Sequence, residues 1–549
     1  MSSETRGCAN AFGLLWVWAI FFFGGPGCNG KAGSSVTSTS ASASAAAAPS
    51  ASAPILAASS LPAQATAAAP SGSAADITSP VANPAPLLKE AVARLARKIT
   101  EFGGHLGVAV LDVQSGELLA AQNDRRPLNP ASNAKLFTAA AALSQLHGGY
   151  RFETGLYGET QGATVVKLVL RGGGDPSLTT RDLWEMVQDL RDHGVRRVEG
   201  DIFVDQHFFD DNVVPPAFEQ QPNEWASFRA PVSALALNEN TVTMTVRPTA
   251  VDSPAAVAFD PPGFVDADGV VKTAAEGHPE NVRLDLLPNG YRMLAHVGGF
   301  VGEHDRAVSF VRRVDNPTLL AGYALRALLV ASGVAFSGDV KPGGEQAKTL
   351  LVLHRSRPLS SLLYELGKSS DNFYAEMVMK TLGAERQGRP GKSSDGADVV
   401  ARYLKEVGAL EEGTVIKNGS GLYDANRVTP LATVKLLRAA YRDPAIAPEY
   451  VAQLAVGGVD GTLHKRFREL REKRLLRAKT GTLEATVALS GYVLPPPGKG
   501  PIAFSILVNN VAGKVTGARA AVDECTESIV HHLWPGSRPS DARRAEPAN

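Results

Sequence analysis

The sequence predicts an α+β fold whose central sheet takes strands from both ends of a long chain. Apolar residues recur at helical spacing over residues 84–102, and a strand pattern follows at 105–113. Two more strand patterns, at 487–493 and 502–509, precede a final helical pattern at 518–533. Because these segments are far apart along the chain, one shared sheet requires a large insertion between them.

The middle of the chain predicts that insertion and divides the protein into several parts. At 549 residues the chain is longer than one ordinary domain. Turn signals and alternating strand patterns fill residues 153–349, which we interpret as two small β-rich subdomains. The predicted order begins with a signal or anchor at 1–30 and a disordered spacer at 31–84. A discontinuous catalytic core then takes residues 85–152 and 350–535, and the insertion between its two parts has its second subdomain at about 240–310. A flexible tail at 536–549 ends the chain.

The N-terminal residues predict an exported protein. Arg6 precedes an apolar stretch at residues 11–23, which suits an export signal better than a membrane span of roughly 20 apolar residues. Cys28 stands where a lipoprotein signal carries its acylated cysteine, although Gly25 replaces the larger apolar residue usual there. A lipid anchor at Cys28, simple cleavage and a retained membrane tether are three alternatives. The following Ala/Ser/Pro-rich spacer cannot bury enough apolar surface to fold.

Charge and cysteine usage exclude several classes of function. The 55 basic and 55 acidic residues balance, so the sequence gives no electrostatic reason to expect nucleic acid as a partner. Cys525 is the only cysteine beyond the presumed signal, so no internal disulfide can form there. It could be reactive, but its helical apolar stripe favours a buried structural residue. We find no zinc motif of the His-Glu-x-x-His type, and the sequence implies no metal and no cofactor.

Ser132-Asn133-Ala134-Lys135 is the first of three motifs that suggest chemistry. Residues three apart share one helix face, so the Ser132 hydroxyl and the Lys135 amine can meet. Serine is a weak nucleophile without an adjacent base, and a desolvated lysine can be that base. A serine at a helix start also lies near backbone N–H groups that can stabilise an oxyanion. Alone, the motif is more typical of a helix N-cap followed by a surface lysine.

Ser370-Asp371-Asn372 is the second motif, and it precedes an amphipathic helical pattern. All three residue types cap helices, which is one interpretation. In the other, Ser370 relays a proton between Lys135 and a leaving amine, and Asn372 holds the substrate amide. The two interpretations are compatible.

Lys479-Thr480-Gly481 is the third motif, and alone it is typical of a turn with a solvated lysine. We interpret it instead as an edge strand beside the serine, where Gly481 lets the backbone approach a ligand closely. Lys479, Thr480 and Thr482 would then bind a carboxylate, and the Thr482 N–H would complete the oxyanion hole.

Each motif occurs once, and their order resembles the signature of penicillin-binding proteins and serine β-lactamases, which use an activated serine to open an amide. The chain further resembles the D-alanyl-D-alanine carboxypeptidase and endopeptidase branch, the low-molecular-mass class C penicillin-binding proteins. The long gap between Ser132 and Ser370 is typical of that branch. The resemblance also rests on Gly173-Gly174-Asp175-Pro176-Ser177-Leu178, Gly200-Asp201-Ile202-Phe203-Val204-Asp205, Ala230-Pro231-Val232-Ser233-Ala234-Leu235, Asn418-Gly419-Ser420-Gly421-Leu422 and Gly458-Val459-Asp460-Gly461-Thr462-Leu463.

This resemblance implies a β-lactamase/transpeptidase-like core, an antiparallel sheet with a helical cluster, carrying two small β-rich inserted domains. It implies a serine-type D-Ala-D-Ala carboxypeptidase, with endopeptidase action as a further activity, that faces the cell wall from the periplasm or a membrane anchor. Peptidoglycan stem peptides would be its substrates and form an acyl-enzyme on Ser132, which penicillin and other β-lactams would trap. A β-lactamase or esterase on the same fold, and a non-catalytic peptidoglycan-binding protein, are the alternatives.

One segment departs from the family pattern. After Gly-Ser-Gly-Leu the family usually continues Ser-Arg, and that arginine helps to bind the substrate's diamino side chain. Here Tyr423-Asp424 reverses the charge, so this contact is not carried over. Asn426 fits the family, and Asn223-Glu224 stand where an acidic substrate contact is often found.

Overall fold

The computed structural model describes residues 84–275, 277, 281–344, 347–471 and 474–535. The predicted signal or anchor with Cys28, the spacer up to residue 83 and the tail at 536–549 lie outside these residues. Within the described ranges, no helix combines the length and apolar character needed to cross a membrane.

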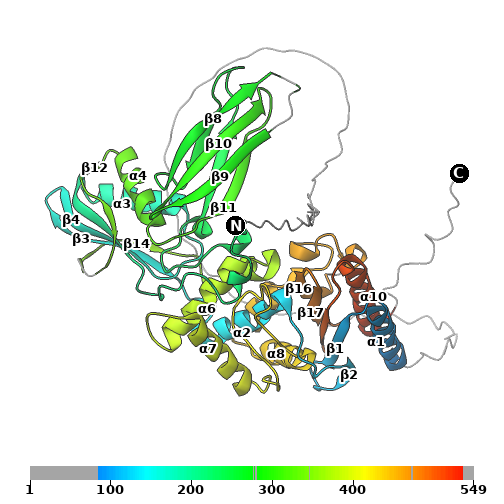
Figure 1. The fold of residues 1–549 in the computed structure, drawn as a ribbon. Helices are drawn as coiled ribbons and strands as arrows, with labels where there is room; N and C mark the ends of the chain where they lie inside the picture. The colour runs from blue at the N-terminus through cyan, green and yellow to red at the C-terminus, as the bar shows by residue number, and fades with distance from the viewer. Residues whose placement is uncertain (1–83, 276, 278–280, 345–346, 472–473, 536–549) are drawn as a thin grey trace, which may run out of the picture. The chain divides into compact units, whose positions relative to one another are not determined.

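A six-stranded antiparallel sheet takes strands from both ends of the chain, which confirms the predicted fold class (Figure 1). Its order is β15-β16-β17-β18-β1-β2, and every neighbouring pair is antiparallel. The strands are β1 (His105–Asp112), β2 (Leu118–Gln122), β15 (Ala455–Val456), β16 (Leu476–Leu483), β17 (Thr486–Val493) and β18 (Ile502–Asn509). The strand patterns of residues 105–113, 487–493 and 502–509 therefore become β1, β17 and β18.

Alternate residues of β1 enter two different hydrophobic clusters, as the two-residue period of a strand requires. Val108 and Val110 pack with the terminal helices α1 (Pro84–Glu101) and α10 (Val515–Leu533), which lie side by side in Figure 1. Ala109 and Leu111 pack instead with the central helices. Both faces of the sheet are therefore covered by helices.

Cys525 lies inside the cluster between α10 and the sheet, as its apolar stripe predicts. Its side chain is buried, and burial raises the pKa of the thiol to about 12. A thiol held so far above neutral pH is a structural residue and not a nucleophile.

The second face of the sheet carries a helical cluster around α2 (Ala134–Leu146). Helix α2 is buried over almost its whole length, and its alanines let α6 pack closely against it. The other helices of this cluster are α5 (Leu359–Tyr364), α6 (Asn372–Arg386), α7 (Ser393–Glu406), α8 (Pro430–Arg442) and α9 (Ala447–Ala452).

Between α2 and α5 the chain forms three further sheets. One has the order β12-β5-β4-β3-β14, with β13 also paired to β5, and two smaller sheets have the orders β11-β6-β7 and β8-β10-β9. Their strands are β3 (Glu153–Gln161), β4 (Thr164–Gly172), β5 (Arg197–Asp205), β6 (Thr241–Arg247), β7 (Ala256–Asp260), β8 (Val265–Ala274), β9 (Asn281–Asn289), β10 (Arg292–Gly302), β11 (Val308–Arg313), β12 (Ala335–Phe336), β13 (Val340–Pro342) and β14 (Leu350–Arg355). Helices α3 (Thr180–Asp192) and α4 (Leu320–Ala331) pack with the first of these sheets.

Candidate active site

Ser132 lies in a short 3-10 turn, η1 (Ala131–Asn133), which leads directly into α2. Ala131 has a left-handed backbone with φ 46°, and its N–H donates to Asn129 Oδ1 at 2.8 Å. Asn133 Nδ2 donates to Lys479 O at 3.2 Å and so joins this turn to β16. The serine is half-buried at the start of a buried helix, as its sequence position predicts.

Lys135 lies fully buried beneath the serine, one helical turn along the chain. Its Nζ lies 3.0 Å from Ser132 Oγ, 2.8 Å from Asn372 Oδ1 and 2.8 Å from Ser420 O. Burial lowers the lysine pKa from 10.5 to about 7, although Asp371 and Glu376 favour the charged form. A neutral amine has two protons for Asn372 and Ser420 and a lone pair left to accept the Ser132 proton.

The second motif caps a helix and also lies beside Lys135. Asp371 caps α6, because its Oδ1 accepts from Tyr374 N at 2.9 Å. Ser370 has a left-handed backbone with φ 64° immediately after the π-helical turn η5 (Glu365–Ser369). Asn372 opens α6, and its Nδ2 donates to Phe228 O at 3.0 Å while its Oδ1 accepts from Lys135.

The third motif lies on β16, which passes beside the serine turn. Lys479 is fully buried, and its Nζ donates to Ser370 Oγ at 2.7 Å. Burial, and then the charge of Lys135, lowers the Lys479 pKa well below its usual value. Thr480 Oγ1 donates to Thr462 Oγ1 at 2.8 Å, whereas the Thr482 side chain is exposed. Among the described strands, only β17 pairs with β16 from Lys479 onward.

Gly481 is required by the close approach of β16 to η1. A Cβ at this position would lie 2.8 Å from Pro130 O and 3.0 Å from Ala131 Cβ. Both distances are shorter than ordinary carbon contacts, so any side chain would push the strand away from the serine. The structure therefore brings the residues of all three motifs together around Ser132.

Two groups in this site were not identified from the sequence. Ser420 O accepts from Lys135, and the fully buried carboxylate of Glu376 accepts from Ser420 N at 2.8 Å and Gly419 N at 3.1 Å. Burial raises the pKa of Glu376 despite these hydrogen bonds. The sequence did contain one indication of Glu376: it follows Asn372 by four residues, and that spacing places both side chains on one face of α6.

The Tyr423-Asp424 departure forms its own set of contacts. The Asp424 carboxylate forms an ion pair with Arg427 at 2.6 Å, which with its other hydrogen bonds lowers its pKa. Tyr423 Oη donates to Gln221 Oε1 at 3.1 Å. The reversed charge is therefore neutralised within the chain.

The two other family-like positions also have partners inside the protein. Glu224 Oε1 accepts from Ala226 N at 2.8 Å. The buried Asn426 side chain accepts from Lys417 N at 2.8 Å and donates to Asn418 O at 3.0 Å, and so holds the loop that carries Ser420.

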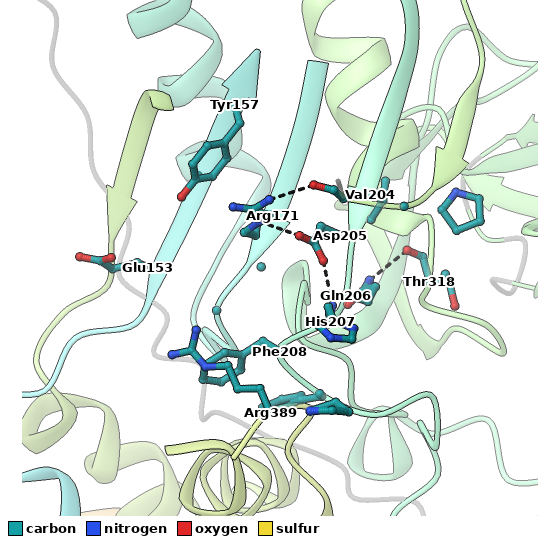
Figure 2. Close-up of a pocket in the computed structure, with 18 of the residues that line it drawn as sticks. Glu153, Tyr157, Arg171, Val204, Asp205, Gln206, His207, Phe208, Thr318 and Arg389 are labelled. Carbon is teal, nitrogen blue, oxygen red and sulfur yellow. Dashed lines mark hydrogen bonds and ion pairs between the residues drawn. The ribbon is translucent and has the colours of Figure 1, made fainter. Parts of the chain in front are cut away.

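A separate cavity of about 1560 Å³ lies at the carboxyl ends of β4 and β5 (Figure 2). Arg171 spans it, stacked over Tyr157 at 4.4 Å and bound to Asp205 Oδ2 at 2.6 Å. No residue of the three motifs lines this cavity. Over the described ranges, no cluster of three or more His, Cys, Asp or Glu side chains is arranged to hold a metal ion.

Comparison with known proteins identifies the family. Residues 88–528 match the model of the D-Ala-D-Ala carboxypeptidase 3 (S13) family. The chain is 35% identical over 430 residues to the D-alanyl-D-alanine carboxypeptidase of Actinomadura sp. strain R39, which covers 75% of this chain and 79% of that protein. It is 24% identical to the D-alanyl-D-alanine carboxypeptidase DacB of Haemophilus influenzae, over 76% of this chain and 88% of that protein.

A solved structure confirms the fold. Penicillin binding protein 4 (dacB) from Haemophilus influenzae superposes with a TM-score of 0.67 at 23% identity, covering 81% of this chain and 99% of that one. Together with the family match over most of the described core, this shows that the chain belongs to the D-Ala-D-Ala carboxypeptidase 3 (S13) family of serine peptidases.

Proposed function

We propose that Ser132 is the nucleophile of this peptidase and that Lys135 is its general base. The observation that carries the proposal is the buried Lys135 amine, with a pKa of about 7 and 3.0 Å from Ser132 Oγ. A base with a pKa near the working pH is deprotonated often enough to take the serine proton. The substrate is a peptidoglycan stem peptide ending in D-Ala-D-Ala.

In the first half-reaction, Ser132 Oγ attacks the carbonyl of the penultimate D-Ala while Lys135 accepts its proton. The N–H groups of Ser132 and Thr482 stabilise the oxyanion of the tetrahedral intermediate. The intermediate then collapses as the C–N bond breaks, and the Ser370 hydroxyl relays the proton from Lys135 to the leaving amine, so that Lys135 is neutral again. D-Ala departs, and the shortened peptide remains as an ester on Ser132.

In the second half-reaction, water replaces D-Ala and hydrolyses the ester. Lys135 accepts a proton from the attacking water and returns it to Ser132 Oγ as the acyl bond breaks. The products are the shortened stem peptide and the regenerated enzyme. Penicillin forms the same ester, but its opened ring stays attached and blocks the approach of water.

Side chains of the second and third motifs recognise two groups of the substrate, its terminal carboxylate and its amide. A buried lysine with a lowered pKa is stabilised as a cation when a carboxylate enters, so Lys479 binds the terminal carboxylate of D-Ala. Thr480 and the exposed Thr482 supply hydroxyl donors to it. Gly481 brings them near the serine. Asn372 Nδ2 donates to Phe228 O in the structure, and it donates instead to the carbonyl of the substrate amide when the substrate binds.

The protein works outside the cytoplasm, where this polymer lies. The apolar segment at residues 11–23 directs export, and Cys28 is the candidate for a lipid anchor. Globomycin treatment, which blocks lipoprotein signal cleavage, would accumulate the precursor if Cys28 is acylated. If globomycin does not change the cleavage of the signal, Cys28 is not acylated, and the N-terminal segment is either simply cleaved or retained as a membrane tether.

Labelled penicillin and peptidoglycan digestion test the proposed function. The protein should be labelled covalently, whereas labelling that persists in Ser132→Ala would contradict the role of Ser132. Mass spectrometry of digested peptidoglycan should show loss of terminal D-Ala. Cleaved crosslinks would show endopeptidase action, and rapid release of the penicillin label would instead favour a β-lactamase.

A further inference from the structure

A second cavity, of about 700 Å³, adjoins β16, which carries the third motif, and η5, which ends directly before the second motif. Lys368 of η5 and Arg477 of β16 line it, each two residues before a motif side chain, Ser370 and Lys479 respectively. None of the motif residues lines the cavity. It is therefore a separate space that shares backbone elements with the active site.

The charges around this cavity are unbalanced. Its cations are Lys368, Arg474 and Arg477, and Asp460 is its carboxylate. Asp460 is already engaged, because Lys368 Nζ lies 2.7 Å from Oδ2 and Val456 N donates to Oδ1 at 2.7 Å. Among the residues that the structure describes, no carboxylate forms an ion pair with either arginine.

Arg477 is the residue that most needs a partner. Its guanidinium is half-buried, and its Nε is buried without a hydrogen-bond acceptor in the described structure. Burial, followed by the like charge of Arg474, lowers the Arg477 pKa. The half-buried charge has no carboxylate partner among the described residues, so an anion that enters the cavity offsets the cost of burying it.

Most of the other residues that line the cavity carry apolar side-chain surface. A small inorganic anion would leave this surface uncovered, whereas an acid with an aliphatic or aromatic body would cover it. The apolar lining residues are Tyr441, Ala447, Pro448, Val451, Ala452 and Leu494.

We propose that this cavity binds an organic carboxylate, with its acid group on Arg477 and Arg474 and its apolar body against Val451 and Leu494. Guanidinium groups bind carboxylates through charge-assisted, often bidentate, hydrogen bonds. The site needs no residue of the catalytic motifs, so it goes beyond the peptidase reaction and does not depend on acylation.

Calorimetric titration of the full chain with sodium benzoate, acetate or inorganic phosphate tests this proposal. Benzoate should bind, and Arg477→Gln should weaken its binding by about tenfold or more, because a charge-assisted hydrogen bond is lost. Arg474→Gln should also weaken binding, and it changes an exposed side chain. Arg386→Gln, an exposed arginine on α6 outside the cavity, is the matched control and should bind as the wild type does.

Each remaining outcome decides the proposal. Benzoate binding that is unchanged in both arginine variants overturns it, as does no binding at millimolar benzoate. Acetate or phosphate that binds as tightly as benzoate overturns the apolar half of the site. Benzoate should bind to Ser132→Ala as tightly as to the wild type, so this test does not depend on the proposed role of Ser132. A loss of benzoate binding in Ser132→Ala would place benzoate in the active site and overturn the proposal.

Discussion

At the scale of single residues, desolvation sets the chemistry of Lys135. A lysine in water keeps its proton at neutral pH, but this one is fully buried and has a pKa of about 7. The nearby carboxylates of Asp371 and Glu376 oppose the shift and do not overcome it. Glu376 is itself committed to the N–H groups of Gly419 and Ser420. The site therefore has an amine that accepts protons at physiological pH.

Replacing Lys135 with methionine should abolish acylation and preserve the fold. Methionine fills a similar volume without the amine, so Ser132 loses its base, and general-base removal typically costs 10² to 10⁴-fold in rate. We expect a fall of at least about 10²-fold in the rate of penicillin labelling. The melting temperature is the control, and labelling at the wild-type rate would show that Lys135 is not the base.

The acylation rate should fall as the pH drops through about 7. The neutral amine is the active form, so each pH unit below the Lys135 pKa removes about nine-tenths of it, and the rate should rise and level off above that pH. Penicillin labelling rates measured between pH 5 and 9 would show this profile. A rate that is flat across neutral pH would contradict the assignment of this pKa to the base.

At the scale of elements, the backbones of α6 and β16 position the residues around Ser132. Helix α6 presents Asn372 and Glu376 on one face, so a single helix contacts Lys135 and also supports the Ser420 loop. Strand β16 runs close to η1 because Gly481 has no side chain. These two contacts determine the spacing between the serine and its neighbours.

Gly481→Ala should reduce acylation more than it reduces stability. The added Cβ would lie 2.8 Å from Pro130 O and would move β16 relative to Ser132, and small misplacements of reacting groups cost large factors in rate. We expect a fall of about tenfold or more in the rate of penicillin labelling. Gly298→Ala on β10, where a Cβ meets nothing within 4 Å, is the matched control and should label as the wild type does.

At the scale of the whole molecule, the segment between α2 and α5 contributes to the catalytic surroundings. Phe228 O accepts from Asn372. The buried Lys380 of α6 forms an ion pair with Asp210 at 2.5 Å and donates to Asn212 O at 2.9 Å. The segment between α2 and α5 is therefore tied to α6, which begins at the candidate active site.

Lys380→Met should destabilise the protein by about 3 kcal/mol, because removal of one partner from a buried ion pair leaves the other uncompensated. Lys341→Met is the control: its pair with Asp201 is exposed and screened by water, so its loss should cost much less than the loss of the Lys380 pair. Urea unfolding of both variants measures the difference. Equal effects would show that the Lys380 pair contributes no more than a surface pair.

The sequence by itself predicted the family, its activity and the general fold. Three motifs in a fixed order indicated a serine, a lysine base and a carboxylate-binding strand, because each depends on local spacing. Strand and helical patterns located β1, β17, β18, α1 and α10, because the strands are short, mostly apolar runs buried on both faces and the helices each carry an apolar stripe.

Only the tertiary structure decided the contacts between distant segments. Ser420 and Glu376 join Lys135 through packing of α2, α6 and a loop, and no local pattern encodes which side chains meet. The same holds for Lys479, whose amine reaches Ser370 across the site. Burial lowers the pKa of both lysines, and burial depends on how the whole chain packs. The sequence thus supplies the candidate reacting groups, and the packed fold sets their protonation.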